Sequence, residues 1–146
     1  MADLAHPPDA RVALDYLAGQ YPGVPVFLAG FSFGARVGLE VGTYDARVGY
    51  LVGVGTPVSI SERDYDFSFV RDCRKPLLLV HGERDEFGTV EDLGALARQA
   101  PPEAGARVEV IAGAGHFFDQ QLEDLRRVVA GWAAERLNEA GANEGG

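Results

Sequence analysis

Three residues of this chain, Ser32, Asp85 and His116, have the types and the order needed for nucleophilic attack on an acyl carbonyl. A serine hydroxyl attacks when a neighbouring histidine takes its proton, and a carboxylate must hold that histidine in one orientation. Triads of this kind occur in several chain orders, and serine, acid, histidine is one of them. The sequence therefore predicts a serine nucleophile, provided that the fold brings these side chains together.

Ser32 stands in the segment Gly30-Phe31-Ser32-Phe33-Gly34, which has the pattern of a nucleophile elbow. The apolar run 26–29 predicts a strand before this segment, and the pattern at 35–41 predicts a helix after it. Small neighbours allow a sharp strand-to-helix turn to lift the serine out of the surface, which gives a reason for both glycines. The alternative is that Ser32 is only a small residue in a glycine-rich turn.

Asp85 and His116 each follow a predicted strand. The run 76–80 reads as a buried parallel strand, and Asp85 lies in the loop at its carboxyl end. His116 lies in a glycine-rich loop after the run 108–111. Because the loops that follow parallel strands gather at one edge of a sheet, we expect both side chains to reach Ser32.

Other interpretations stay open for several of these residues. Glu83 and Glu86 share the loop of Asp85, which could instead cap the following helix. His116 could be a loop histidine that bonds only to backbone. His81, at the end of its strand, fits structural packing better than a chemical role.

Four segments of the chain carry a recognisable pattern. They are Gly-Phe-Ser-Phe-Gly-Ala at 30–35, Asp-Phe-Ser-Phe at 66–69, Leu-Val-His-Gly-Glu-Arg-Asp-Glu at 79–86 and Gly-His-Phe-Phe at 115–118. In these segments the chain resembles the α/β-hydrolase superfamily, and within it the small bacterial dienelactone-hydrolase-like and carboxylesterase-like proteins without a large cap domain. The resemblance implies that Ser32 is the nucleophile, Asp85 the acid and His116 the base, and that the backbone amide of Phe33 is one oxyanion donor.

The resemblance runs from about Ala10 to Leu137 and corresponds to the second half of a typical member of the superfamily. Members usually begin with further strands, and an early loop there gives the second oxyanion donor. Removing one such donor typically costs about 10²- to 10³-fold in turnover.

The expected function is cofactor-independent hydrolysis of small esters, thioesters or lactones. The alternatives are a non-catalytic ligand- or partner-binding protein and an inactive truncated form.

Alternating strands and helices predict one domain over 1–146, an α/β protein with a three-layer α/β/α sandwich and a mostly parallel sheet, which is a partial α/β-hydrolase fold. The segment 58–75 is expected to form a loop or short helix near the site, and 139–146 a frayed tail. Strands are expected at 24–29, 48–54, 76–80 and 108–111, and helices at 7–19, 35–41, 90–99 and 120–138.

Composition excludes several classes of function. A net charge of −9 argues against nucleic acid or an anionic membrane as the main partner. The single cysteine, Cys73, excludes an internal disulfide. No segment has the length of an apolar membrane span and the start lacks an export signal, so the expected location is the cytoplasm. No metal-ligand spacing and no nucleotide-binding glycine motif occurs, so neither a metal nor a cofactor is expected.

Aromatic side chains next to the triad suggest how a small acyl substrate is bound. Phe31 and Phe117 are expected to line the substrate pocket, with Phe33 as a further neighbour.

The strand at 24–29 would be central in a complete superfamily member. In this chain it is expected at an exposed apolar edge, which invites pairing with another chain. A homodimer through that edge strand is therefore predicted.

Overall fold

The structure is a computed structural model of the 146-residue chain, and it describes residues 7–62 and 65–144. Strands and helical segments alternate along it, as the sequence predicts. They are α1 (Pro7–Gln20), β1 (Val26–Phe31), α2 (Phe33–Tyr44), β2 (Val48–Val54), the 3₁₀ helix η2 (Ser68–Asp72), β3 (Leu77–Gly82), α3 (Val90–Gln99), the 3₁₀ helix η3 (Pro102–Ala104), β4 (Arg107–Ile111) and α4 (Leu122–Glu144).

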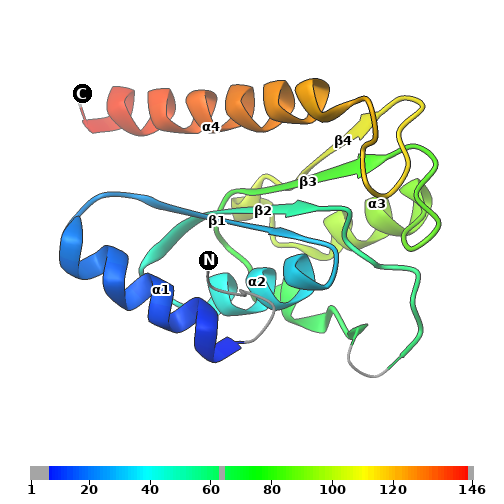
Figure 1. The fold of residues 1–146 in the computed structure, drawn as a ribbon. Coiled ribbons are helices and arrows are strands. Elements are labelled where there is room, and N and C mark those ends of the chain that lie inside the picture. The colour runs from blue at the N-terminus through cyan, green and yellow to red at the C-terminus, as the bar shows by residue number, and fades with distance from the viewer. Residues whose placement is uncertain (1–6, 63–64, 145–146) are drawn as a thin grey trace.

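The strands form one parallel sheet in the order β1-β2-β3-β4. Val54 at the end of β2 lies beside Phe31 at the end of β1 and beside Val80 of β3. Gly82 at the end of β3 lies beside Ile111 at the end of β4. The carboxyl ends therefore meet at one edge of the sheet, on the right in Figure 1, and the loops that carry the predicted site residues leave from it.

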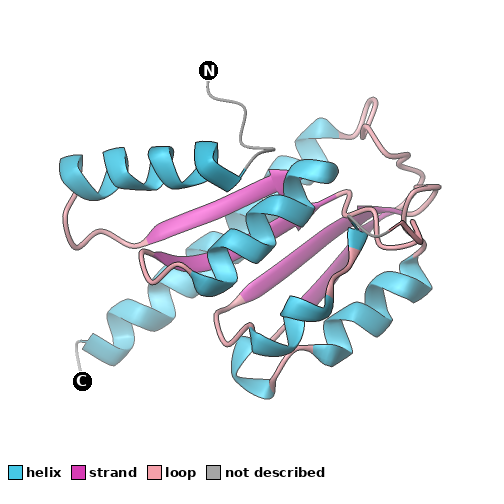
Figure 2. Ribbon diagram, turned by 90° about the horizontal axis from the view of Figure 1, so that it is seen from below, coloured by secondary structure: helices cyan, strands magenta, loops and turns pink. Residues whose placement is uncertain are grey.

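Helices cover both faces of the sheet, so the molecule has three layers. In Figure 1, α4 lies above the sheet, while α1, α2 and α3 lie below it. The turned view in Figure 2 shows α1, α2 and α3 in front of the strands and α4 behind them. This arrangement confirms the predicted α/β/α sandwich with a parallel sheet.

The strand β3 explains why the layers form, because all of its residues are buried. Successive side chains of a strand point to opposite faces, and β3 is apolar on both. Leu77 and Leu79 belong to the core between the sheet and the helices α1, α2 and α3. Leu78 and Val80 join the second core, which includes Trp132 of α4. A strand that is buried at every position and mostly apolar is typical of a central parallel strand.

Several element boundaries differ from the sequence prediction. The strand β1 continues to Phe31 and α2 begins at Phe33, so the turn between them is shorter than expected. The helix α4 continues past Asn138 to Glu144, so the predicted frayed tail is wrong up to that residue. Alanine and glutamate in this stretch favour helix and compensate for Gly141. Residues 145 and 146 lie outside the described part of the chain.

The strand β1 lies at one edge of the sheet, as the sequence predicts. Its residues, Val26 to Phe31, carry no charge, whereas the opposite edge strand β4 carries Arg107 and Glu109. Charged residues on an edge strand discourage pairing with another chain.

In the two described ranges of the chain, no helix combines the length and the apolar character that crossing a membrane requires.

Candidate active site

Ser32 is the only residue between β1 and α2, and its backbone is strained. Its φ of 57° and ψ of −124° place it in a region that costs a non-glycine residue about 1–3 kcal/mol. Its N–H donates to the carbonyl of Val54 at 2.9 Å, and its own carbonyl accepts from Ala35 and Arg36 at 2.9 and 3.3 Å. These bonds to β2 and α2 over-determine the turn and hold the serine in place.

Only one of the two glycines that flank Ser32 is required by space. A Cβ atom on Gly30 would lie 2.3 Å from the carbonyl oxygen of Gly34 and 2.8 Å from Cα of Ala35, so the turn closes only with glycine at that position. A Cβ atom on Gly34 would meet open space. A small residue was expected to be needed at both positions, and the structure supports this for Gly30 alone.

The structure brings Ser32, His116 and Asp85 into one hydrogen-bonded path. The Nε2 atom of His116 lies 2.9 Å from Oγ of Ser32, and its Nδ1 atom lies 2.7 Å from Oδ2 of Asp85. An ionised carboxylate can only accept, so Nδ1 carries the hydrogen and Nε2 is left to accept from the serine hydroxyl. A serine proton can therefore pass to His116 without any rearrangement of the ring.

Asp85, rather than another acid of its loop, faces His116. Its side chain is fully buried, and its Oδ1 atom accepts from the N–H of Phe87 at 2.8 Å. Glu83 instead accepts from the N–H of Gly113 at 2.9 Å, and Glu86 is exposed. The residue that caps α3 is Thr89, whose hydroxyl accepts from the N–H of Asp92. The alternatives left open by the sequence are thereby decided at the level of geometry.

A close approach of two backbones brings His116 to this position. A Cβ atom on Gly82, at the end of β3, would lie 2.5 Å from the carbonyl oxygen of Gly115 and 2.6 Å from that of Ala114. The loop after β4 can therefore pass over β3 only because Gly82 has no side chain. Sequence reasoning missed this residue, although a glycine directly after a buried strand is a signal of close approach.

Phenyl rings surround the imidazole of His116. The ring centres of Phe31, Phe87 and Phe117 lie 5.1, 4.8 and 5.0 Å from its centre. Apolar neighbours exclude water and leave the imidazole to its two hydrogen bonds. Phe31 and Phe117 were predicted at the site, and Phe87 was missed. Phe33 lies further round, with its ring centre 5.7 Å from that of Tyr65.

A cavity of about 250 Å³ opens beside Ser32 and His116. Tyr65 lines it, so the segment 58–75 does border the site, as expected. The other lining residues are Pro57, Ile60, Phe87 and Phe117. Pro57 and Ile60 have no reactive or polar side-chain group, and no sequence pattern indicated them.

The backbone N–H of Phe33 lies at the amino end of α2. The first amides of a helix have no carbonyl of the same helix to bond to, and this end of the helix carries a partial positive charge. The amino end of α2 next to Ser32 therefore favours a negative charge. In the described ranges, no group of three or more His, Cys, Asp or Glu residues is placed to hold a metal ion.

His81 lies within the protein beneath the acid. It is fully buried, and its Nε2 atom lies 2.5 Å from the carbonyl oxygen of Gly88 and 3.6 Å from Oδ2 of Asp85. It has no contact with Ser32 or His116 among its hydrogen bonds and ion pairs. The structural interpretation of His81 is in keeping with this position.

The profile of the protein family described as "Alpha/beta hydrolase domain" matches residues 9–131. The chain belongs to the α/β-hydrolase family. The match covers every strand and the helices α2 and α3, which are the elements that position Ser32, Asp85 and His116. The resemblance seen in the sequence is confirmed at the level of the superfamily.

Solved structures share this α/β-hydrolase fold. An alpha-beta serine hydrolase homologue from Coxiella burnetii is 30% identical, with a TM-score of 0.71 over 84% of this chain and 55% of its own. A serine hydrolase without lid from Xanthomonas campestris is 26% identical, with a TM-score of 0.69 over 86% of this chain and 55% of its own. The second of these structures fits the expected resemblance to α/β-hydrolases that lack a large cap.

Curated relatives of this α/β-hydrolase are longer than the chain itself. An uncharacterised protein of Rickettsia prowazekii is 27% identical over 125 residues, which is 83% of this chain and 52% of that protein. An (R)-3-hydroxydecanoyl-ACP:CoA transacylase of Pseudomonas putida is 38% identical over 74 residues, which is 47% of this chain and 24% of that protein. The chain thus spans about half the length of the first of these relatives.

Proposed function

We propose that this α/β-hydrolase is a serine hydrolase that cleaves small carboxylic esters, thioesters or lactones. The observation that carries the proposal is the hydrogen-bonded path from Oγ of Ser32 through His116 to the carboxylate of Asp85. A hydroxyl, an imidazole and a carboxylate in this sequence of bonds form a base-assisted nucleophile. The similarity to a serine hydrolase homologue supports the same class of reaction.

The reaction begins when Oγ of Ser32 attacks the acyl carbonyl carbon while Nε2 of His116 takes the hydroxyl proton. The carbonyl oxygen becomes an oxyanion, which accepts from the backbone N–H of Phe33. The bond to the alcohol or thiol then breaks, and the leaving group takes the proton from His116. An acyl group remains on Ser32.

Water completes the cycle in a second step. His116 takes a proton from the water as its oxygen attacks the acyl group on Ser32. The second tetrahedral intermediate breaks at the bond to Oγ, which recovers the proton from His116, and the carboxylic acid leaves. Throughout, Asp85 accepts from Nδ1–H of His116 and stabilises the positive form of the ring.

We further propose that a second oxyanion donor belongs to the half of the longer relatives that has no counterpart in this chain. One preorganised donor is worth about 10²- to 10³-fold in turnover. The chain by itself is therefore expected to acylate slowly rather than to be inert, because Ser32 and His116 are already in contact.

A second acceptor for the acyl group is favoured by the partial match to a transacylase. An acyl group on Ser32 can pass to a thiol as readily in principle as to water, with the same base. Incubation with a p-nitrophenyl ester in the presence of coenzyme A distinguishes hydrolysis from transfer to a thiol. Hydrolysis gives the free acid alone, whereas transfer gives a thioester that mass spectrometry detects.

Labelling with a fluorophosphonate tests the proposed function. The folded protein should be modified at Ser32, and Ser32→Ala and His116→Ala should each abolish or slow the labelling by at least a hundredfold. Ser61→Ala is the matched control, since Ser61 is an exposed serine of the loop after β2. Unreactive Ser32 in folded protein would instead favour a non-catalytic ligand- or partner-binding role.

A further inference from the structure

A second cavity, larger and lined by apolar side chains, lies between the end of β1 and the first turns of α4. Its volume is about 430 Å³, which is within the range of small-molecule sites. No lining residue has a polar side chain, and those that shape it most are Phe31, Val54, Phe117, Leu122 and Leu125. The cavity is therefore suited to a hydrocarbon group and offers no side-chain partner to a polar one.

Several of these side chains are exposed without serving the core. Phe31 is 43% exposed, and Phe117 and Leu122 are each 65% exposed. The neighbouring core position is filled by Phe118, which is 1% exposed. Clustered exposed apolar side chains beside a reactive group are typical of a binding surface.

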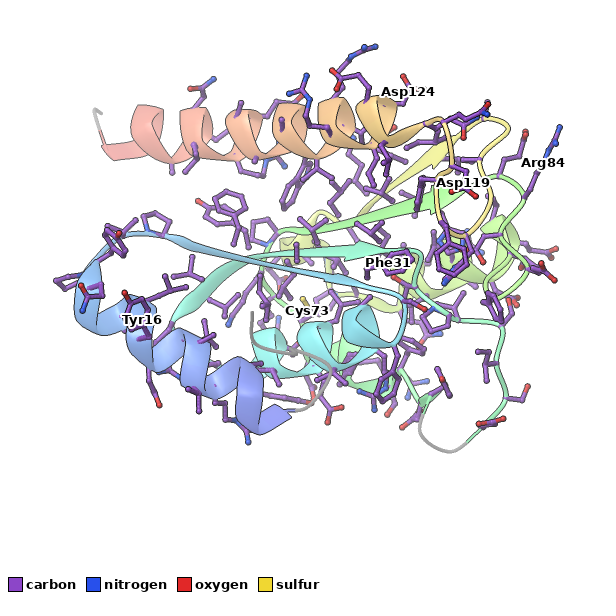
Figure 3. The ribbon with its side chains drawn as sticks, viewed as in Figure 1. Tyr16, Phe31, Cys73, Arg84, Asp119 and Asp124 are labelled. Carbon is purple, nitrogen blue, oxygen red and sulfur yellow. The ribbon has the colours of Figure 1, made fainter. Side chains whose placement is uncertain are left out.

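The apolar cavity is joined to the reacting atoms through shared walls. Phe31 directly precedes Ser32, and its ring centre lies 5.1 Å from that of His116 and 5.9 Å from that of Phe117. Phe117 lines both this cavity and the smaller one beside Ser32. Figure 3 shows Phe31 at the end of β1, on the side of the molecule where Arg84 and Asp119 mark the loops after β3 and β4.

The two cavities differ in polarity in the same way as the two halves of an ester. The smaller cavity is lined by Ser32, Tyr65 and His116, which are residues with polar groups. A leaving group has an oxygen or sulfur to place near such groups, whereas an unbranched acyl chain has none. Each methylene moved from water into an apolar cavity contributes about fourfold to binding.

We propose that the apolar cavity binds the acyl chain of the substrate, and that the smaller cavity binds the leaving group. The inference rests on the proposed function and narrows its substrate class to esters and thioesters of unbranched, medium-chain carboxylic acids. Phe117 separates the two halves of the substrate, and the side chains of Leu122 and Leu125 form the far wall for the acyl chain.

The test is a chain-length series of p-nitrophenyl esters from acetate to dodecanoate. For the unmodified chain, kcat/KM should rise at least tenfold from acetate to octanoate. Leu122→Phe narrows the cavity at an exposed position and should lower the octanoate-to-acetate ratio at least tenfold. Leu137→Phe is the matched control, because Leu137 is also an exposed leucine of α4 but lies outside the cavity. It should leave the ratio unchanged.

Two outcomes overturn the inference while the proposed function stands: acetate and octanoate being cleaved equally well, or Leu122→Phe leaving their ratio unaltered. A binding measurement keeps the inference testable if no ester is cleaved. Octanoate titrated into Ser32→Ala protein should perturb the NMR signals of Leu122 and Leu125, and acetate should not. Absence of that perturbation overturns the acyl-chain site, whereas absence of Ser32 labelling overturns the proposed function.

Discussion

The imidazole of His81 and the carboxylate of Asp85 lie together inside the protein, with Nε2 of the ring 3.6 Å from Oδ2 of the acid. The same Nε2 atom is 2.5 Å from the carbonyl oxygen of Gly88. Because that carbonyl can only accept, Nε2 carries the hydrogen. His81, at the end of β3, therefore bonds to Gly88 at the other end of the loop that carries Asp85. It also lies next to Asp85, the residue that orients His116.

Replacement of His81 should weaken both the fold and the reactivity of Ser32. His81→Leu leaves the buried carbonyl of Gly88 without a donor, which costs about 1–3 kcal/mol. His81→Gln can place an N–H near the position of Nε2 and should recover most of that loss. The fluorophosphonate labelling rate, measured on protein shown to be folded by circular dichroism, should fall at least tenfold in His81→Leu. Equal rates in the two variants would make His81 purely structural.

Alanine at the two glycines beside Ser32 should have opposite effects. Gly30→Ala forces a Cβ atom against the carbonyl of Gly34, and such overpacking costs about 1–3 kcal/mol. Gly34→Ala places its Cβ atom in open space within a helix, where alanine is favoured over glycine by about 0.5–1 kcal/mol. Thermal unfolding should show a lower Tm for the first variant and an unchanged or higher Tm for the second. A matching loss in both would contradict the structure of this turn.

Pairing of two copies through β1 is a further prediction. That edge strand carries no charge, and Val24 just before it is 56% exposed. Light scattering after size exclusion should give twice the chain mass of 15.6 kDa. Val24→Lys should shift the mass toward the monomer, whereas Val90→Lys on α3 should not. A monomer at every concentration would exclude the homodimer.

The ion pair of Asp45 and Arg47 should contribute to stability in weak acid. Hydrogen bonds from Arg47 lower the pKa of Asp45 from 3.8 to about 2. A lowered pKa in the folded state means that the contribution is complete above the unfolded pKa and is lost as the pH falls toward 2. Between pH 4 and 2 the unmodified chain should therefore lose about 1 kcal/mol more than Asp45→Asn, in the range of surface ion pairs. Urea unfolding at both pH values measures the difference, with Asp119→Asn as the exposed control.

The chain pattern predicts the sheet and the neighbourhood of the site because both depend on local signals. Apolar runs followed by loops predict parallel strands, and the order of Ser32, Asp85 and His116 predicts their convergence at one edge. The distances between them agree with that prediction. These are properties of short segments, which can be read without knowing how distant segments pack.

Features that depend on contacts between distant loops could not be predicted in the same way. The sequence favours Asp85 but leaves Glu83 open, because the outcome depends on a turn that sends the two carboxylates in different directions. The need for Gly82 appears only when the loop after β4 crosses above it. Phe87 lies against His116 because of that same crossing. Pairwise proximity of this kind has no periodicity in the sequence.

Ser32, Asp85 and His116 come from segments that follow the strands, so the far end of the sheet carries no part of the triad. The turn between η3 and β4 lies at that far end, and the position of Gly105 within it is surrounded by open space. A dye or a surface anchor attached at this turn would stand a full strand length away from the reacting atoms. Attachment to a solid support through this turn would therefore leave the triad on the side that faces the bulk solution.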